Sequence, residues 1–199
     1  MSTSTLEVWE GGESTVFEPY CVKRRVLNFF VCRKRKTPSF RDARCYSLWG
    51  DSNIGWVLNE GTNGAGSIVT MWHKEVFSYG THIVGTSLIA IVVCHLKTKR
   101  QCVVVNVYVQ WEVLTALKQS YCNLALVVCG DFIVVRREEE RKGIGGCSSQ
   151  KKEIDGFNRF IENNGLLDIP CVGKKYTWYK ANGTAKSILD RFLMSKAWL

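Results

Sequence analysis

Short apolar runs separated by Gly, Asn and Asp dominate the chain from residue 47 onward. Runs of this length and spacing are typical of β-strands. Four charged or polar residues at 97–100 separate two of the longest runs and predict a β-hairpin with a charged tip. The predicted strands cover residues 55–60, 67–72, 82–96, 101–109 and 124–132.

Two segments have helical spacing instead. Residues 112–122 carry Val113, Leu114 and Leu117, and residues 151–163 carry apolar side chains at intervals of three or four, followed by Gly165 as a stop signal. Two further strands are predicted near the end of the sequence, at 175–179 and 187–194, with a turn at Asn182-Gly183. Strands with interspersed helices predict an α+β or α/β layered domain.

The first forty residues have a different texture. Residues 1–20 are polar and acidic without periodicity, which predicts a loose arm, and 26–32 form a short apolar run that is compatible with a strand. The 199-residue chain has a net charge of +9, yet residues 21–44 alone hold nine basic residues against one acidic residue. The rest is almost neutral, so the basic balance points to nucleic acid only through this one segment.

Other classes of protein are disfavoured by what the sequence does not contain. The most apolar stretch, 83–94, is shorter than the roughly 18 residues that cross a bilayer. No signal peptide is visible, so we expect no membrane association and an intracellular location, in the nucleus or the cytoplasm. Nine cysteines without a C-x-x-C pair predict buried free thiols without disulfide partners rather than a zinc site, and the three histidines show no ligand spacing.

The residues with chemical potential lie at the ends of apolar strands. Tyr108 ends the run that begins at Cys102, Asp131 follows the run 124–130, and Asp190 lies in the last predicted strand. A carboxylate at the mouth of an apolar strand is costly unless it faces water, a metal or a partner, so three such positions predict a shared cleft. Each also has a structural interpretation, since Gly130-Asp131 is compatible with a turn and Asp190-Arg191 with an ion pair.

These motifs, in their order, resemble the endonuclease/exonuclease/phosphatase (DNase I-like) family. The similarity is greatest to the endonuclease domains of plant LINE-type retroelement proteins. It covers residues 41–199, whereas residues 1–40 show no convincing match. The motifs that carry it are Ser47-Leu-Trp-Gly50, the run 64–72, Asn106-Val-Tyr108, Gly130-Asp131-Phe132, the run 173–178 and the run 187–193.

The resemblance implies a four-layer α/β/β/α sandwich, with two mainly antiparallel or mixed sheets flanked by helices, and Mg²⁺-assisted hydrolysis of phosphodiesters in DNA. A hard cation that stabilises phosphate charge suits carboxylate ligands. By resemblance, Asp131 activates the attacking water, Tyr108 lies beside the phosphate or the metal, and Asp190 orients a catalytic histidine.

The sequence also departs from the family pattern. The Asn that follows Gly-Asp-Phe in the family is Ile133 here, and losing one transition-state donor costs roughly 10²–10³ in rate. The metal-binding Glu is not retained, because Lys34 or Arg35 stands near its place and would repel Mg²⁺. The family's closing Ser-Asp-His motif is not found before Leu199. We therefore expect a truncated, degenerate copy that binds Mg²⁺ poorly and is inactive or nearly so.

Two other interpretations stay open: a non-catalytic nucleic-acid-binding module that uses the basic segment 21–44, and a retroelement relic without selected function. The mixed-charge segment 136–142 is predicted to be a solvated loop or helix start. Tyr176, Trp178 and Tyr179 could stack on bases, although core packing of Trp178 is the preferred interpretation.

Overall fold

The computed structural model describes residues 7–8, 22–23, 29–34, 42–60, 67–108, 113–121, 123–143, 148–170 and 175–198. Most of the predicted N-terminal arm therefore lies outside the described residues. Within that part of the sequence, β1 (Glu7–Val8) pairs with β2 (Val22–Lys23). The apolar run predicted at 26–32 is represented by β3 (Phe29–Lys34).

The centre of the molecule is a six-stranded sheet in the order β11-β14-β9-β8-β7-β6. Its pairs are antiparallel except β8 and β9, which run parallel and are connected through α2 (Val113–Ser120). A crossover helix is the usual way to join parallel neighbours. The strands are β6 (Phe77–Gly85), β7 (Leu88–His95), β8 (Gln101–Tyr108), β9 (Ala125–Asp131), β11 (Leu166–Asp168) and β14 (Asp190–Ser195).

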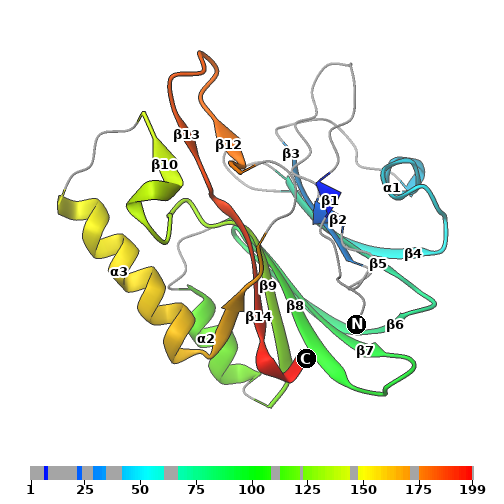
Figure 1. The fold of residues 1–199 in the computed structure, drawn as a ribbon. Helices are drawn as coiled ribbons and strands as arrows, with labels where there is room; N and C mark the ends of the chain where they lie inside the picture. Colours follow the sequence, from blue (N-terminus) through cyan, green and yellow to red (C-terminus); the bar gives the residue numbers. More distant parts are fainter. Residues whose placement is uncertain are drawn as a thin grey trace, which may run out of the picture.

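Two smaller sheets accompany it. One has the order β3-β5-β4, with β5 (Ser67–His73) between β3 and β4 (Ile54–Asn59). The other joins three two-residue strands in the order β10-β13-β12, at the end of the large sheet where β14 begins (Figure 1). These strands are β10 (Arg141–Lys142), β12 (Trp178–Tyr179) and β13 (Lys186–Ser187).

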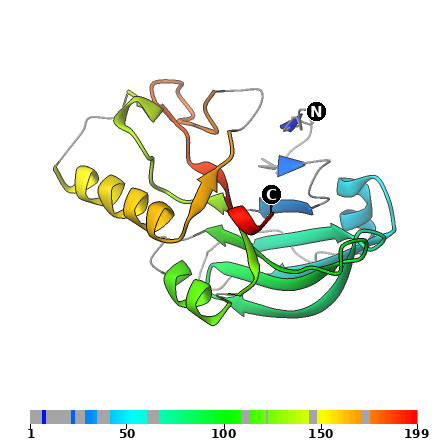
Figure 2. The ribbon, with the colours of Figure 1, turned by 60° about the horizontal axis from the view of Figure 1, so that its bottom comes forward.

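The layers follow from alternation of side chains along the strands. One face of the large sheet, with Val104, Cys129 and Phe192, packs against Ile68 and Trp72 of β5. The opposite face packs against α2 and α3 (Ser148–Asn163), and α1 (Asp42–Trp49) covers the outside of β4 and β5. Figures 1 and 2 show the helices on the two outer sides of the paired sheets. The predicted α+β, four-layer sandwich is therefore confirmed.

Polar contacts also join the six-stranded sheet to the sheet β3-β5-β4 at the C-terminal end of β8. The Asn106 side-chain amide donates to the Val69 carbonyl at 2.9 Å and contacts the Thr70 hydroxyl at 3.2 Å. Asn59 at the end of β4 donates to the carbonyl of Gly85 at 2.6 Å. The sheet β3-β5-β4 thus crosses the large sheet beside the residues that end β8.

Several predicted strands are divided in the structure. The run 82–96 was predicted as one strand, but it turns at 86–87, so that β6 and β7 form a hairpin. The run 187–194 is interrupted at 188–189, between β13 and β14, and strand structure in 175–179 is confined to Trp178–Tyr179. The first prediction was wrong because the polar Thr86 and Ser87, after Gly85, form a turn within the run. The second was wrong because the apolar Ile188 and Leu189 continue through an interruption at which the Thr177 hydroxyl binds the backbone.

The other predictions agree closely with the structure. The β7–β8 hairpin has its tip at 97–100, where Lys99 adopts a left-handed conformation, and α3 starts three residues before the predicted helix. None of the helices in the described part of the chain is long and apolar enough to cross a membrane. Cys45, Cys102 and Cys129 are buried free thiols, and burial raises the pKa of Cys102 to about 12.

Candidate functional site

The large sheet brings Tyr108, Asp131 and Asp190 side by side. Tyr108 is the register partner of Asp131 in the parallel β8–β9 pair, and Asp131 is the partner of Asp190 in the antiparallel β9–β14 pair. Register partners on adjacent strands project from the same face. The three residues, here called the polar row, therefore lie across three neighbouring strands at one end of the sheet.

The polar row faces the sheet β3-β5-β4. Two residues before Tyr108, the side chain of Asn106 contacts Val69 and Thr70. Cys129 and Phe192 lie two residues from Asp131 and Asp190, hence on the same face of the sheet, and pack in the core between the sheets. Asp190 is 8% exposed, whereas Asp131 and Tyr108 are half-buried. The row thus begins where the dry core between the sheets ends, and Asp131 and Tyr108 retain access to solvent.

A tight turn fixes Asp131. Gly130 has φ +132°, and a Cβ there would stand 2.1 Å from the Val107 carbonyl oxygen, so the position requires glycine. One Asp131 carboxylate oxygen, Oδ1, accepts a hydrogen bond from the Ile133 amide at 3.0 Å. Phe132 is fully buried, with its ring 5.1 Å from that of Phe157 on α3. The residues that follow β9 are therefore held by a buried ring on one side and an Asx turn on the other.

Ile133 has an unusual backbone for its residue type. Its φ is +59°, a left-handed conformation that β-branched residues adopt at a cost, and its side chain is 48% exposed. Asn is among the residues that tolerate this conformation best. The position at which the family resemblance expects Asn is therefore one whose backbone also favours Asn over Ile.

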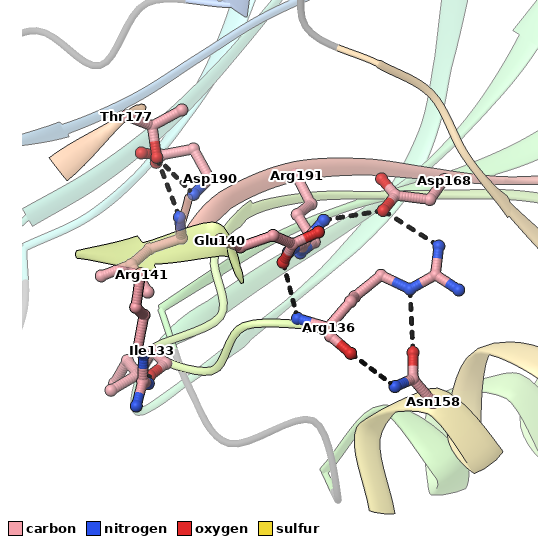
Figure 3. A network of polar contacts seen from close by, with 10 residues as sticks. Ile133, Arg136, Glu140, Arg141, Asn158, Asp168, Thr177, Asp190 and Arg191 are labelled. Atoms are coloured by element: carbon pink, nitrogen blue, oxygen red, sulfur yellow. Dashed lines mark hydrogen bonds and ion pairs between the residues drawn. The ribbon is translucent and has the colours of Figure 1, made fainter. Parts of the chain in front are cut away.

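The backbone at Asp190 is fixed by Thr177. The Thr177 hydroxyl oxygen, Oγ1, accepts hydrogen bonds from the amides of Leu189 at 2.9 Å and Asp190 at 3.0 Å (Figure 3). These two amides lie at the interruption between β13 and β14, so the hydroxyl satisfies donors that no strand pairing reaches. Thr177 defines where β14 begins and hence where Asp190 is placed.

A buried ionic network lies on the helix side of the same strand (Figure 3). Arg191, 5% exposed, pairs with Asp168 through Nη1 at 2.7 Å and with Glu140 through Nη2. Arg136 also pairs with Asp168, at 3.1 Å, and exchanges hydrogen bonds with Asn158 on α3. The network ties β14, β11, α3 and the segment after Ile133 together, and it makes Arg191 a structural residue.

The segment 136–142 is more ordered than a solvated loop. It contains the 3₁₀ turn η1 (Glu138–Glu140) followed by β10, and the Glu140 carboxylate accepts a hydrogen bond from the Arg136 amide at 2.7 Å. The prediction of a solvated loop or helix start was therefore incomplete, because the partner Arg191 of Glu140 lies 51 residues away. Tyr176 is buried and Tyr179 is 49% exposed, with Trp178 half-buried between them.

The described residues do not assemble a divalent-cation site. Among the described residues, no group of three or more His, Cys, Asp and Glu side chains could hold a metal ion. Lys34, the last residue of β3, pairs in register with Ser67. The next residue of β5, Ile68, is the register partner of Asn59 on β4. The Asn59 side chain donates a hydrogen bond to Gly85 at the turn between β6 and β7, and the same turn accepts a hydrogen bond from the Tyr108 amide. A basic residue thus occupies the strand end nearest the polar row in the described part of β3, where the resemblance expects an acidic ligand.

The histidines lie elsewhere. His95 ends β7 at the charged hairpin tip, eight residue positions along the paired strands from Tyr108, and His82 is on the edge strand β6. His73 contacts Asp51 at 3.3 Å, at the opposite end of β5 from Ser67. The described part of the chain therefore shows no histidine beside Asp190.

Sequence reasoning missed Thr177, Glu140 and Arg136 as residues that hold the site. Thr177 carries a weak signal, since it directly precedes the short strand β12 and Thr hydroxyls commonly form hydrogen bonds with backbone groups. The ionic network carries none, because its members are brought together by folding alone.

No family model matches this sequence, and no curated protein matches it either. Solved structures do resemble its fold. The endonuclease domain of TRAS1, a telomere-specific non-LTR retrotransposon, matches with a TM-score of 0.54 and 10% identity over 84% of this chain and 73% of that one.

Two further structures match at similar levels. The 3′ phosphatase NExo from Neisseria, bound to a product DNA hairpin, has a TM-score of 0.57 and 15% identity over 85% of this chain and 77% of that one. An endonuclease/exonuclease/phosphatase family protein from Bacteroides thetaiotaomicron has a TM-score of 0.56 and 9% identity over 85% and 69%. The chain thus has the DNase I-like fold that these endonuclease/exonuclease/phosphatase proteins share.

Proposed function

We propose that this chain is an endonuclease-like, phosphodiester-binding domain of retroelement origin, related to the endonuclease domains of plant LINE-type elements, in which hydrolysis is impaired. The observation that carries the proposal is the polar row: Tyr108, Asp131 and Asp190 are adjacent in register at the solvent end of the core. The DNase I-like fold supports the same assignment.

In this proposal Asp131 is placed to accept a proton from an attacking water, because the residue is half-buried and its turn holds one carboxylate oxygen in a fixed direction. Tyr108 would donate its hydroxyl to a phosphate oxygen. Asp190, which is buried, would orient a neighbouring group rather than react. The partner is DNA, and the reaction class is hydrolysis of a phosphodiester.

Impairment follows from two features of this chain. Ile133 cannot donate a side-chain hydrogen bond to a phosphate, which costs roughly 10²–10³ in rate if such a donor is required. The described residues assemble no metal-binding group, and a basic residue, Lys34, ends β3 where the resemblance expects an acidic ligand. Mg²⁺ is therefore the cofactor that the resemblance implies, and the described residues offer no site for it.

DNA binding in a chelating buffer tests whether the polar row meets the backbone of DNA. We expect a fluorescein-labelled duplex to bind, and Asp131→Asn to tighten binding roughly 3- to 10-fold, because one negative charge next to phosphate is removed. Asn keeps an acceptor for the Ile133 amide. The control Asp155→Asn removes the same charge from the exposed face of α3 and should not change the dissociation constant. Equal effects of the two variants would refute a site at the polar row.

The non-catalytic alternative has its own signature. If the basic segment 21–44 carries the interaction, replacing Lys34, Arg35 and Lys36 by Gln should abolish binding and flatten its salt dependence, whereas Asp131→Asn should have no effect. Absence of binding by the unmodified chain would leave a relic without nucleic-acid function.

A further inference from the structure

Arg141 differs from Arg136, in the same segment after Asp131, and from Arg191 of β14. Arg136 and Arg191 each pair with at least one carboxylate. Arg141 makes no ion pair with any side chain in the described part of the structure. Its guanidinium has a single hydrogen bond, from Nη2 to the Ile133 carbonyl at 3.5 Å.

The position of Arg141 is well defined. It is the first residue of β10 and the register partner of the buried Ser187, and the neighbouring Ile188 amide donates to the Glu140 carbonyl at 3.0 Å. From this anchored backbone the side chain extends to the Asp131–Ile133 turn, where it lies against Ile133 (Figure 3). The positive charge of Arg141 therefore lies beside the turn that also holds the Asp131 carboxylate.

The Arg141 guanidinium is incompletely satisfied. Its Nε is buried and has no hydrogen-bond partner among the described residues, although the residue as a whole is half-buried. A guanidinium carries five N–H donors in a planar fork that matches the oxygens of carboxylate or phosphate. Withdrawing part of such a charge from water without a counter-ion costs free energy, and an anion bound at the accessible edge would offset that cost.

We propose that the Arg141 guanidinium, which lies beside the exposed Ile133 and the polar row, forms an anion subsite that takes a backbone phosphate of nucleic acid. The identity of the anion rests on the proposed function. The Asp131 carboxylate repels phosphate, so a cation from β10 that reaches this turn supplies the attraction that a phosphodiester needs to approach. Phosphate is favoured over a protein carboxylate because the fold neighbours include a structure bound to a DNA hairpin.

A purely structural role for Arg141 makes different predictions. If the side chain only anchored the Asp131–Ile133 turn, its removal would lower the melting temperature, and anion binding would not depend on whether residue 141 carries a positive charge. If it is a ligand group, Arg141→Gln should leave the melting temperature nearly unchanged, because the hydrogen bond it removes is long and its Nε has no partner.

The test uses the full chain, a labelled DNA duplex and inorganic phosphate in a chelating buffer. Arg141→Gln should weaken duplex binding roughly 5- to 20-fold and reduce the slope of log K against log salt by about 1, as loss of one phosphate contact does. Arg141→Lys keeps the charge and should stay within about 3-fold. The control Arg137→Gln removes the same charge from an exposed position four residues earlier and should leave both quantities unchanged.

The thermal shift with inorganic phosphate separates this subsite from the proposed function. Phosphate should raise the melting temperature of the unmodified chain and of Arg137→Gln, but not of Arg141→Gln. Stabilisation that depends on Arg141 without duplex binding would support the subsite and refute the proposed function. Duplex binding that Arg141→Gln leaves intact, or weakening by Arg137→Gln to the same degree, would overturn the subsite while the proposed function stands.

Discussion

Replacing Ile133 by Asn should stabilise the protein, although it exchanges an apolar side chain for a polar one. The backbone at this position has φ +59°, in the left-handed region where a β-branched side chain is strained. Asn is one of the few residues other than Gly that enter this region readily. Ile133 is also 48% exposed, so only about half of its apolar surface is buried, and the substitution loses only the stabilisation that this buried half provides.

Two opposing contributions set the magnitude. Relief of the left-handed conformation is worth about 1–2 kcal/mol. Full burial of an Ile side chain contributes about 1.5–3 kcal/mol, and the buried half that Asn does not replace accounts for about 0.5–1 kcal/mol. The net gain is about 0.5–1 kcal/mol, which corresponds to a rise in melting temperature of about 1–4 °C for a chain of this length.

The comparison with Ile133→Thr isolates the backbone contribution. Thr is polar like Asn but β-branched like Ile, so it loses the apolar contact and keeps the strain. Urea unfolding of the two variants should place Asn above Thr by about 1–2 kcal/mol in the free energy of unfolding. A Thr variant as stable as the Asn variant, or more so, would refute the argument from backbone strain.

Three other predictions concern the residues that hold the site. Gly130→Ala should lower the free energy of unfolding by about 3 kcal/mol or more, measured by urea unfolding, because its Cβ would overlap the Val107 carbonyl oxygen at 2.1 Å; an unchanged midpoint would contradict this. Arg191→Met should cost about 3–5 kcal/mol by the same assay, since it removes the ion pair of the largely buried Glu140 carboxylate and leaves Asp168 with Arg136 alone, whereas Arg159→Met on the exposed face of α3 should cost less than about 0.5 kcal/mol. Burial raises the pKa of the Cys102 thiol from 9.0 to about 12, so this thiol should resist iodoacetamide in the native state at pH 9 and react after unfolding in urea. Because the thiol of the unfolded chain ionises at lower pH, the contribution of Cys102 to stability is complete below pH 9 and is lost as the pH rises toward 12. Rapid native alkylation, detected by mass spectrometry of the Cys102 peptide, would contradict that assignment.

The elements that could be predicted from the sequence are those whose signal is local. The helix at Ser148–Asn163 has four buried apolar residues at helical spacing and ends near Gly165, which has φ +57°. The β7–β8 hairpin has a charged tip between apolar runs. In both cases the pattern of side chains determines burial directly, so periodicity was sufficient.

The divided strands were not predicted, for two different reasons. At 86–87 the sequence carries a local turn signal, Gly85-Thr86-Ser87, which the prediction of a single strand overlooked, and the structure pairs Gly85 with Leu88 across that turn. The interruption at 188–189 depends on the Thr177 hydroxyl, which is more than ten residues away. Non-local hydrogen bonds leave no periodic trace in the sequence.

The candidate site shows the same division. Tyr108, Asp131 and Asp190 were predicted to share a cleft because each ends or begins an apolar strand, and the structure places them in register on adjacent strands. Their catalytic roles stay a prediction. The left-handed conformation of Ile133 and the unpaired guanidinium of Arg141 emerge only once β9, β10 and β13 are assembled.

Nicking of supercoiled plasmid in the presence of Mg²⁺ tests the central claim most directly. The claim is that the polar row is assembled while hydrolysis is impaired. The account predicts that the unmodified chain nicks plasmid no faster than Asp131→Ala does, over hours and at micromolar protein. Nicking by the unmodified chain that Asp131→Ala abolishes would contradict it, and would show that Asp131 acts without the family's Asn and its acidic metal ligand.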